Sequence, residues 1–229
     1  MILLLPLLLC APTFAQEPVK TEEADEILEG HSSHGESFNE GPRQAAYLFP
    51  AQANVSFPVT TDSEEAQTFF NQGVSNLHGF WYFEAERTFR HVLSLDEGCI
   101  MALWGMAMAN VDNEDRAADF ARRAWLGRDS VTERERMYID SLTDFYEVEG
   151  EETPKRLQEL DEKKEKEERE ARNKRKKSRA KDLVKAYEGI VWEFPDDLEA
   201  KAFLVNRLWL NTRLGVPNSS RQANEAILQ

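Results

Sequence analysis

The apolar residues of this chain recur mostly at the three- and four-residue spacing of amphipathic helices. A first helix is expected to begin after Ser63, a good N-cap that is followed by two glutamates in the first turn. Its apolar positions are Phe69, Phe70, Gly73, Leu77 and Phe80. Gly79 interrupts this pattern, and a second helix is predicted over residues 82–95. The stretch therefore predicts two helices that need each other to bury their apolar faces.

The same arrangement of small and large residues returns directly afterwards. The first set is Gly73, Ala85, Phe89 and Val92, and the second set is Gly105, Ala117, Ala121 and Ala124. Small residues let two helices approach closely, and a large side chain fills the groove between them. Asn113 is the expected N-cap of the fourth helix. Two helix pairs with matching offsets indicate an array of repeated units.

A third unit begins with Thr132 and Glu135, which have the spacing of a capping box. Its apolar stripe is followed by a charged insertion over residues 147–181, so the partner helix is expected only after residue 181. That helix carries Tyr187 and ends near Pro195. A further apolar helix is predicted from Leu198.

A last apolar helix is predicted after residue 219, and its pattern continues to the end of the sequence at Gln229. Terminal units of a repeat array normally have a polar outer face. The last unit is therefore expected to be incomplete. Two alternatives stay open: the sequence is a fragment, or its end docks on a partner.

The spacing of these residues resembles that of the tetratricopeptide-repeat (TPR) family. Gly73 and Ala85 match the family's two small positions. Phe89 matches the family's large position four residues after Ala85, and Val92 lies near the small position that follows. Phe69 stands where the family usually has Trp, and Glu97 stands where a terminating Pro is common. Five segments spanning residues 41 to about 210 also resemble exported bacterial TPR proteins of uncharacterised role. They read GPRQAAYLFP, FPVTT, LHGFWYFEAERTF, ALWGMAMAN and FPDDLEAKAFL.

This resemblance implies an all-α fold, a right-handed solenoid of antiparallel helix pairs spanning residues 63–229, located outside the cytoplasm. It carries no catalytic residues that could be transferred to this chain. The departures from the family pattern are the charged helical insertion and an irregular N-terminal lead-in.

The charged insertion contains many acid–base pairs four residues apart and no apolar stripe. It is expected to be a solvated extension of a helix. Its second half is basic, with Arg172, Lys174, Arg175, Lys176, Lys177, Arg179 and Lys181. The simplest interpretation of this patch is a soluble helix with asymmetric charge. The alternative is contact with an anionic membrane or polymer through residues 172–181.

Residues 1–15 are apolar and end in small residues, as a secretory signal peptide does. We expect cleavage near Ala15, although no Lys or Arg precedes the apolar run. A lipoprotein would use Cys10, but Leu9 stands where a small residue is expected. Residues 16–40 predict a flexible acidic lead-in, and residues 41–62 an N-terminal cap on the array. No transmembrane span is expected after removal of the signal, so the protein would be periplasmic or extracellular.

The formal net charge of −14 argues against specific nucleic-acid binding. No nucleophile, phosphate-loop or paired-cysteine motif is present, so we expect neither an enzyme nor a cofactor. His31 and His34 form an HxxH pair, but flanking glycines favour a surface loop over a metal site. Cys99 precedes an apolar run and is expected to be a buried hydrophobe.

The predicted function is therefore a non-catalytic scaffold that binds a protein or peptide in a groove. The candidate contact residues are Asn71, Gln72, Asn76, His78 and Asn110, chosen from the first helix of each pair. The alternative is a metal-binding or enzymatic module that uses His31, His34 and sequence beyond residue 229. A third possibility is electrostatic tethering through the basic patch.

Overall fold

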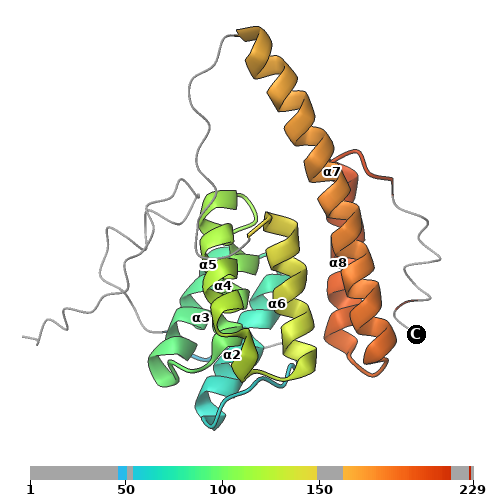
Figure 1. Cartoon of the computed structure of the whole chain (residues 1–229). Helices are drawn as coiled ribbons and strands as arrows, with labels where there is room; N and C mark the ends of the chain where they lie inside the picture. Colours follow the sequence, from blue (N-terminus) through green and yellow to red (C-terminus); the bar gives the residue numbers. More distant parts are fainter. Residues whose placement is uncertain (1–45, 51–53, 149–161, 218–226, 228–229) are drawn as a thin grey trace, which may run out of the picture.

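The computed structural model describes residues 46–50, 54–148, 162–217 and 227 of the 229-residue chain. The predicted signal peptide, the acidic lead-in with His31 and His34, and the predicted last helix lie outside these residues. The described part is all-helical and contains no strand (Figure 1). Its elements are α2 (Glu64–His78), α3 (Tyr82–Leu95), α4 (Ile100–Ala109), α5 (Glu114–Leu126), the short 3₁₀ helix η1 (Arg128–Ser130), α6 (Glu133–Tyr146), α7 (Glu162–Glu193) and α8 (Leu198–Arg213).

The helix starts follow the expected capping residues. The Ser63 side chain accepts a hydrogen bond from the Ala66 amide at the start of α2. Asn113 caps α5 in the same way, and Thr132 and Glu135 form the predicted capping box of α6. These side chains satisfy amides that have no partner within the first turn. The local signals therefore placed these three helix starts correctly.

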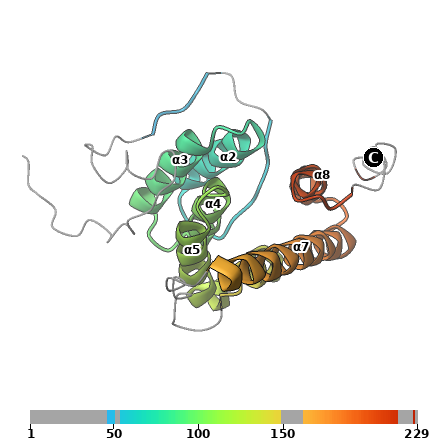
Figure 2. The same ribbon diagram turned by 90° about the horizontal axis from the view of Figure 1, so that it is seen from above.

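The helices are arranged in two layers. Consecutive helices pack against one another from α2 through α8, and α4 also contacts both α2 and α6. Helices α2, α4 and α6 thus form an inner layer, and α3, α5 and α7 lie outside it. Seen from above, α8 lies beside α7 and apart from the α2–α5 ribbons (Figure 2). Its side chains nevertheless reach the inner layer, since Phe203 contacts the rings of Trp104 and Tyr138.

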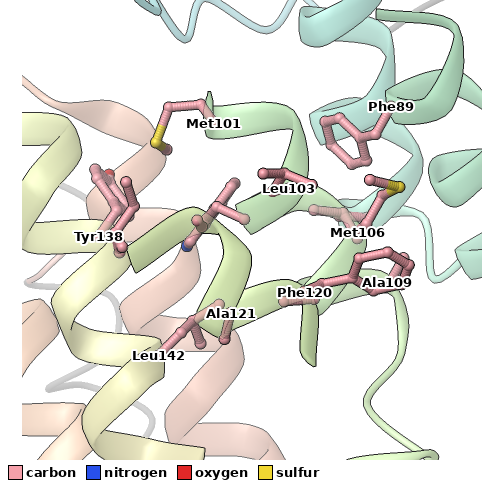
Figure 3. Packing of buried hydrophobic residues seen from close by; sticks show 14 of the residues in the cluster. Phe89, Met101, Leu103, Met106, Ala109, Phe120, Ala121, Tyr138 and Leu142 are labelled. Atoms are coloured by element: carbon pink, nitrogen blue, oxygen red, sulfur yellow. The ribbon is translucent and has the colours of Figure 1, made fainter. Parts of the chain in front are cut away.

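Helix α4 is the centre of the hydrophobic core. Nearly all of its side chains are buried, including Trp104 and Met106, because α2, α3, α5 and α6 surround it. Figure 3 shows these side chains between Phe89 and Phe120 on one side and Tyr138 and Leu142 on the other. A helix that is apolar all round is expected to be buried, and α4 has this character. The side chains at the other positions of the two sets are also buried. They are Ala85, Val92, Ala117, Ala121 and Ala124.

Residues 162–181 of the charged insertion and the helix after them form one continuous helix, α7 (Glu162–Glu193). Its first part is charged and extends beyond the other helices (Figure 1). From Ala180 onward its inward face is buried, with Tyr187 among the buried residues, and Pro195 lies in the turn before α8. The described part of the charged insertion is therefore an extension of a helix, as expected. The reason is that helical hydrogen bonds continue through a change of composition when no Pro or Gly interrupts them.

None of the helices in the described part is both long enough and apolar enough to cross a membrane.

Candidate functional site on the inner helical layer

The most specific arrangement on the inner layer is an extended stretch of the chain itself. Residues 54–60 form no helix or strand and pass along α2 toward α6. Phe57 is fully buried, and its ring lies 5.4 Å from Phe70 of α2, 5.5 Å from Trp104 of α4 and 5.0 Å from Tyr138 of α6. A single aromatic side chain therefore contacts all three inner helices.

Side-chain amides of α2 bind the main chain of this stretch. The Phe57 amide donates to Asn71 Oδ1 at 3.1 Å, and Gln67 Nε2 donates to the Phe57 carbonyl at 2.9 Å. Gln67 Oε1 accepts from the Val59 amide at 2.9 Å, and Gln67 Nε2 also bonds Asn71 Oδ1. These bonds replace the partners that a neighbouring β-strand would supply. Because they involve main-chain atoms, they do not depend on which side chains the bound stretch carries.

Helix α6 binds the same stretch from its other end. Both the amide and the hydroxyl of Thr60 donate to the Glu135 carboxylate at 2.6 Å. Arg134 Nη1 donates to the Pro58 carbonyl at 3.0 Å, and the Arg134 guanidinium lies 4.2 Å from the centre of the Phe57 ring. Glu135 is buried and also accepts from Thr132, so one carboxylate serves the cap of α6 and the bound stretch together.

A second short stretch, residues 46–50, is bound in a similar way. Gln72 is fully buried, and its amide accepts from the Phe49 amide at 2.9 Å and donates to the Tyr47 carbonyl at 3.0 Å. Residues 41–62 were expected to form an N-terminal cap on the array. The described part of this range passes along the inner layer, where Phe57 packs among three aromatic rings and side-chain amides of α2 pair with the main chain.

Helix α8 faces the other end of α2. His78 Nε2 lies 2.5 Å from Glu199 Oε2, and the His78 ring contacts the Phe203 ring at 4.6 Å. The Asp197 carboxylate caps α8 and also accepts from Tyr138 Oη at 2.8 Å and Arg134 Nε at 2.7 Å. Burial raises the pKa of the Tyr138 hydroxyl, and the adjacent Asp197 raises it further, so the hydroxyl donates as a neutral group.

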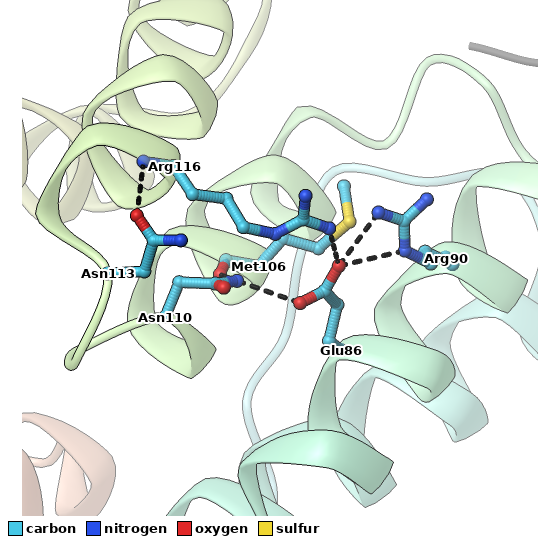
Figure 4. Close-up of polar contacts among 6 residues, drawn as sticks. All are labelled: Glu86, Arg90, Met106, Asn110, Asn113 and Arg116. Atoms are coloured by element: carbon cyan, nitrogen blue, oxygen red, sulfur yellow. Dashed lines mark hydrogen bonds and ion pairs between the residues drawn. The ribbon is translucent and has the colours of Figure 1, made fainter. Parts of the chain in front are cut away.

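The other predicted contact residues also have intramolecular partners. Asn76 is buried and its amide donates to the Thr88 hydroxyl at 3.4 Å. Asn110 is buried and donates at 2.8 Å both to Glu86 Oε2 and to the Met106 carbonyl. Figure 4 shows Glu86 between Asn110, Arg90 and Arg116, with both arginines paired to its other oxygen. An incoming partner would have to displace bonds such as these to reach Gln72, Asn76 or Asn110.

The basic patch is partly neutralised by neighbouring helices. Lys176 pairs with Glu114 of α5, and Arg179 pairs with Glu147. The other five cations of the patch are exposed. Cys99 is fully buried, as expected, and burial raises the pKa of its thiol to about 12. Within the described ranges, no group of three or more His, Cys, Asp and Glu side chains is placed to hold a metal ion.

The comparisons with known proteins assign no family. No family model matches the chain, and neither a curated protein nor a solved structure is significantly similar to it. The site must therefore be interpreted from its own geometry.

Sequence reasoning identified Asn71 and Gln72 as polar residues of the inner layer but missed Gln67, Arg134 and Glu135. A signal for Gln67 was present, since Gln67 and Asn71 are four residues apart and so lie on one face of α2. Glu135 was interpreted as a capping residue alone. Its bond to Thr60, 75 residues away in sequence, could not be deduced from local spacing.

Proposed function

We propose that this protein is a non-catalytic helical-repeat scaffold that binds an extended segment of another protein on its inner helical layer. We further propose that its helix pairs form a TPR-like solenoid that acts outside the cytoplasm. In the arrangement described above, residues 57–60 occupy the binding surface, so a partner segment takes their place after their release.

Two features support a TPR-like solenoid. The inner helices α2, α4 and α6 lie next to one another, and the outer helices α3 and α5 each pack between two inner ones, as repeated helix pairs do. Gly73 and Gly105 both lie against Phe89, which belongs to the helix between them. The export of the protein rests on residues 1–15, whose composition is that of a signal peptide.

The observation that carries the binding function is the contact between Gln67, Asn71 and the main chain at Phe57. Binding an extended segment through its main-chain atoms, with an anchoring side chain in a pocket, is a common mode of peptide recognition. Here the main-chain partners are amides of α2 and the anchor is a buried aromatic ring. The same surface suits a partner segment that presents an aromatic residue to Phe70, Trp104 and Tyr138.

A peptide-exchange experiment tests this function. The Phe57→Ala variant removes the chain's own anchor and leaves its aromatic pocket open. A labelled synthetic peptide with the sequence of residues 54–61 should bind this variant saturably in fluorescence anisotropy, and the wild-type chain much more weakly. A display library of extended peptides selected on the variant should then yield ligands with an aromatic anchor.

Two controls make the result specific. A peptide with Ala in place of its Phe should lose most of its affinity, and Asn71→Ala combined with Phe57→Ala should weaken the unmodified peptide by about 2- to 12-fold, the loss of one hydrogen bond. Equal binding of both peptides, or no saturable binding by the well-folded Phe57→Ala variant, would contradict the proposed function.

A further inference from the structure

A cavity separate from the extended stretch lies where α8 closes over the ends of the inner helices. Its walls come from α2, α3, α4, α6, α7 and α8, and most of the lining is apolar, including Leu77, Met108, Leu142 and Leu210. The free space among these side chains totals about 510 Å³, including the part that opens to solvent. Because its lining is mostly apolar, the cavity suits a hydrocarbon chain better than a polar ligand.

A single cation, Arg207 of α8, projects among these apolar residues. Its guanidinium lies 4.3 Å from the centre of the Phe145 ring, and its Nε atom is buried without a hydrogen-bond partner among the described residues. No ion pair links Arg207 to a carboxylate within the described part of the chain. Buried polar groups are normally hydrogen-bonded, so the Nε–H group of Arg207 is available to an acceptor that enters the cavity.

The polar groups nearest to Arg207 do not supply a negative charge. The ionisable groups that influence its guanidinium are the hydroxyls of Tyr146 and Tyr187, which also line the cavity. Burial raises the pKa of both hydroxyls, so both remain neutral at physiological pH. Burial also lowers the pKa of Arg207.

Exposed aromatic rings lie beside the cavity on the α2–α3 turn. Tyr82, which lines the cavity, contacts the Phe80 ring, and Phe80 contacts Trp209 of α8 at 5.6 Å. Phe80 and Trp209 are about half exposed. Phe80 has a φ angle of 58°, a left-handed conformation that is costly for a bulky residue and is concentrated at functional sites. This backbone conformation keeps a large apolar ring at the surface near the cavity.

From these observations we propose that the cavity is a binding site for an unbranched aliphatic monocarboxylate, such as a medium-chain fatty acid. The carboxylate pairs with Arg207 and accepts a hydrogen bond from a tyrosine hydroxyl. The hydrocarbon chain lies along the leucine and methionine side chains and leaves past Phe80 and Trp209. A carboxylate supplies an acceptor for the Arg207 Nε–H group and a counter-charge for its guanidinium, and a hydrocarbon chain matches the apolar lining. This site is independent of the surface that binds residues 57–60.

Isothermal titration of the full chain with decanoate tests the proposal. We expect saturable binding of one decanoate per chain, and a loss of about 10- to 100-fold in the Arg207→Met variant, in which a charge-assisted hydrogen bond is removed. The matched control is Arg175→Met, which removes an exposed arginine from the projecting part of α7 and should leave the affinity unchanged. Decanol has the same chain without the charge and should bind much more weakly than decanoate.

Circular dichroism and the unfolding midpoint show whether the Arg207→Met variant is folded. If it folds poorly, measurements on the wild-type chain alone still test the proposal. Affinity should rise from hexanoate to decanoate as more chain is buried, and decanoate should bind far better than decanol. Equal affinity for the acid and the alcohol, equal affinity of wild type and a folded Arg207→Met variant, or uptake that does not saturate would each overturn the proposal.

Discussion

Gly73 of α2 lies so close to Phe89 of α3 that a Cβ atom on the glycine would come within 2.5 Å of the ring. Gly105 of α4 meets the same ring at the same distance. Phe89 is fully buried between the two glycines, so its ring has no room to move away. The three residues therefore set how closely the first helix pair packs on α4.

We predict that Gly73→Ala destabilises the protein despite the better helix propensity of alanine. The propensity gain is about 1 kcal/mol. Overpacking against a buried ring costs about 1–3 kcal/mol. The free energy of unfolding, measured with urea, should fall. The control is Gly189→Ala in α7, where a Cβ atom would meet only Met137 at an ordinary 3.9 Å. That change should be neutral or stabilising, and a Gly73→Ala variant as stable as Gly189→Ala would contradict the packing argument.

The carboxylate of Glu86 makes a second testable link, this time between α3 and α5. Glu86 and Arg116 are both fully buried, and Glu86 also binds Arg90 and Asn110 (Figure 4). Replacing Glu86 with Leu should destabilise the fold by about 3–5 kcal/mol, because it leaves the Arg116 charge buried without its main partner. The double variant Glu86→Leu with Arg116→Leu should be more stable than Glu86→Leu alone. Thermal unfolding of both variants measures the difference, and additive losses would show that the two side chains are not coupled.

Glu135 is expected to hold the extended stretch against α6. Glu135→Gln keeps the shape of the side chain but removes the charge that accepts from both Thr60 and Thr132. Losing charge-assisted hydrogen bonds should lower the free energy of unfolding by about 1.5–3 kcal/mol. Amide hydrogen exchange at Thr60 should accelerate. Glu133→Gln changes an exposed glutamate in the same helical turn and should have little effect on either measurement. Unchanged exchange at Thr60 in Glu135→Gln would refute the assigned role.

Cys99 should be unreactive in the folded protein. Its thiol is fully buried, and burial raises its pKa from 9.0 to about 12, so the reactive thiolate is scarce near neutral pH. In a chain carrying Cys10→Ser, labelling by a thiol reagent at pH 8 should follow the rate of unfolding and accelerate in urea. Rapid labelling without denaturant would show that Cys99 is accessible.

The same shift predicts how Cys99 affects stability at alkaline pH. Its folded pKa lies above its unfolded value, so its contribution to stability is fully present below about pH 9 and is lost as the pH rises through about 12. The cause is that the unfolded state releases the thiol proton at a lower pH than the folded state does. This release lowers the free energy of the unfolded state relative to that of the folded state. Cys99→Ala should remove this part of the alkaline loss of stability in pH-dependent urea titrations.

Local sequence was sufficient to predict the helices and several of their ends. Ser63, Asn113 and the Thr132–Glu135 pair act within one helical turn, so their effect is visible without knowledge of the fold. The span of α3 also follows from its apolar face and from the turn before it. The all-α class is confirmed for the described residues for the same reason.

The surfaces of the helices were less predictable. Gln72 and Asn110 are polar residues of the kind that form binding contacts. Their use as partner contacts remains a prediction. The structure buries both against other parts of the chain. A polar residue on a helix can face solvent, a partner or a distant main-chain group, and helical spacing does not distinguish among these.

The sequence by itself determined the helical character of the chain and the capping of its helices, because these depend on neighbours within a few residues. Only the tertiary structure decided that Phe57 lies across three helices and that Arg207 lies beside neutral tyrosines. Both depend on groups far apart in sequence, and the energy of a buried aromatic ring or a buried charge is set by whatever the fold places around it.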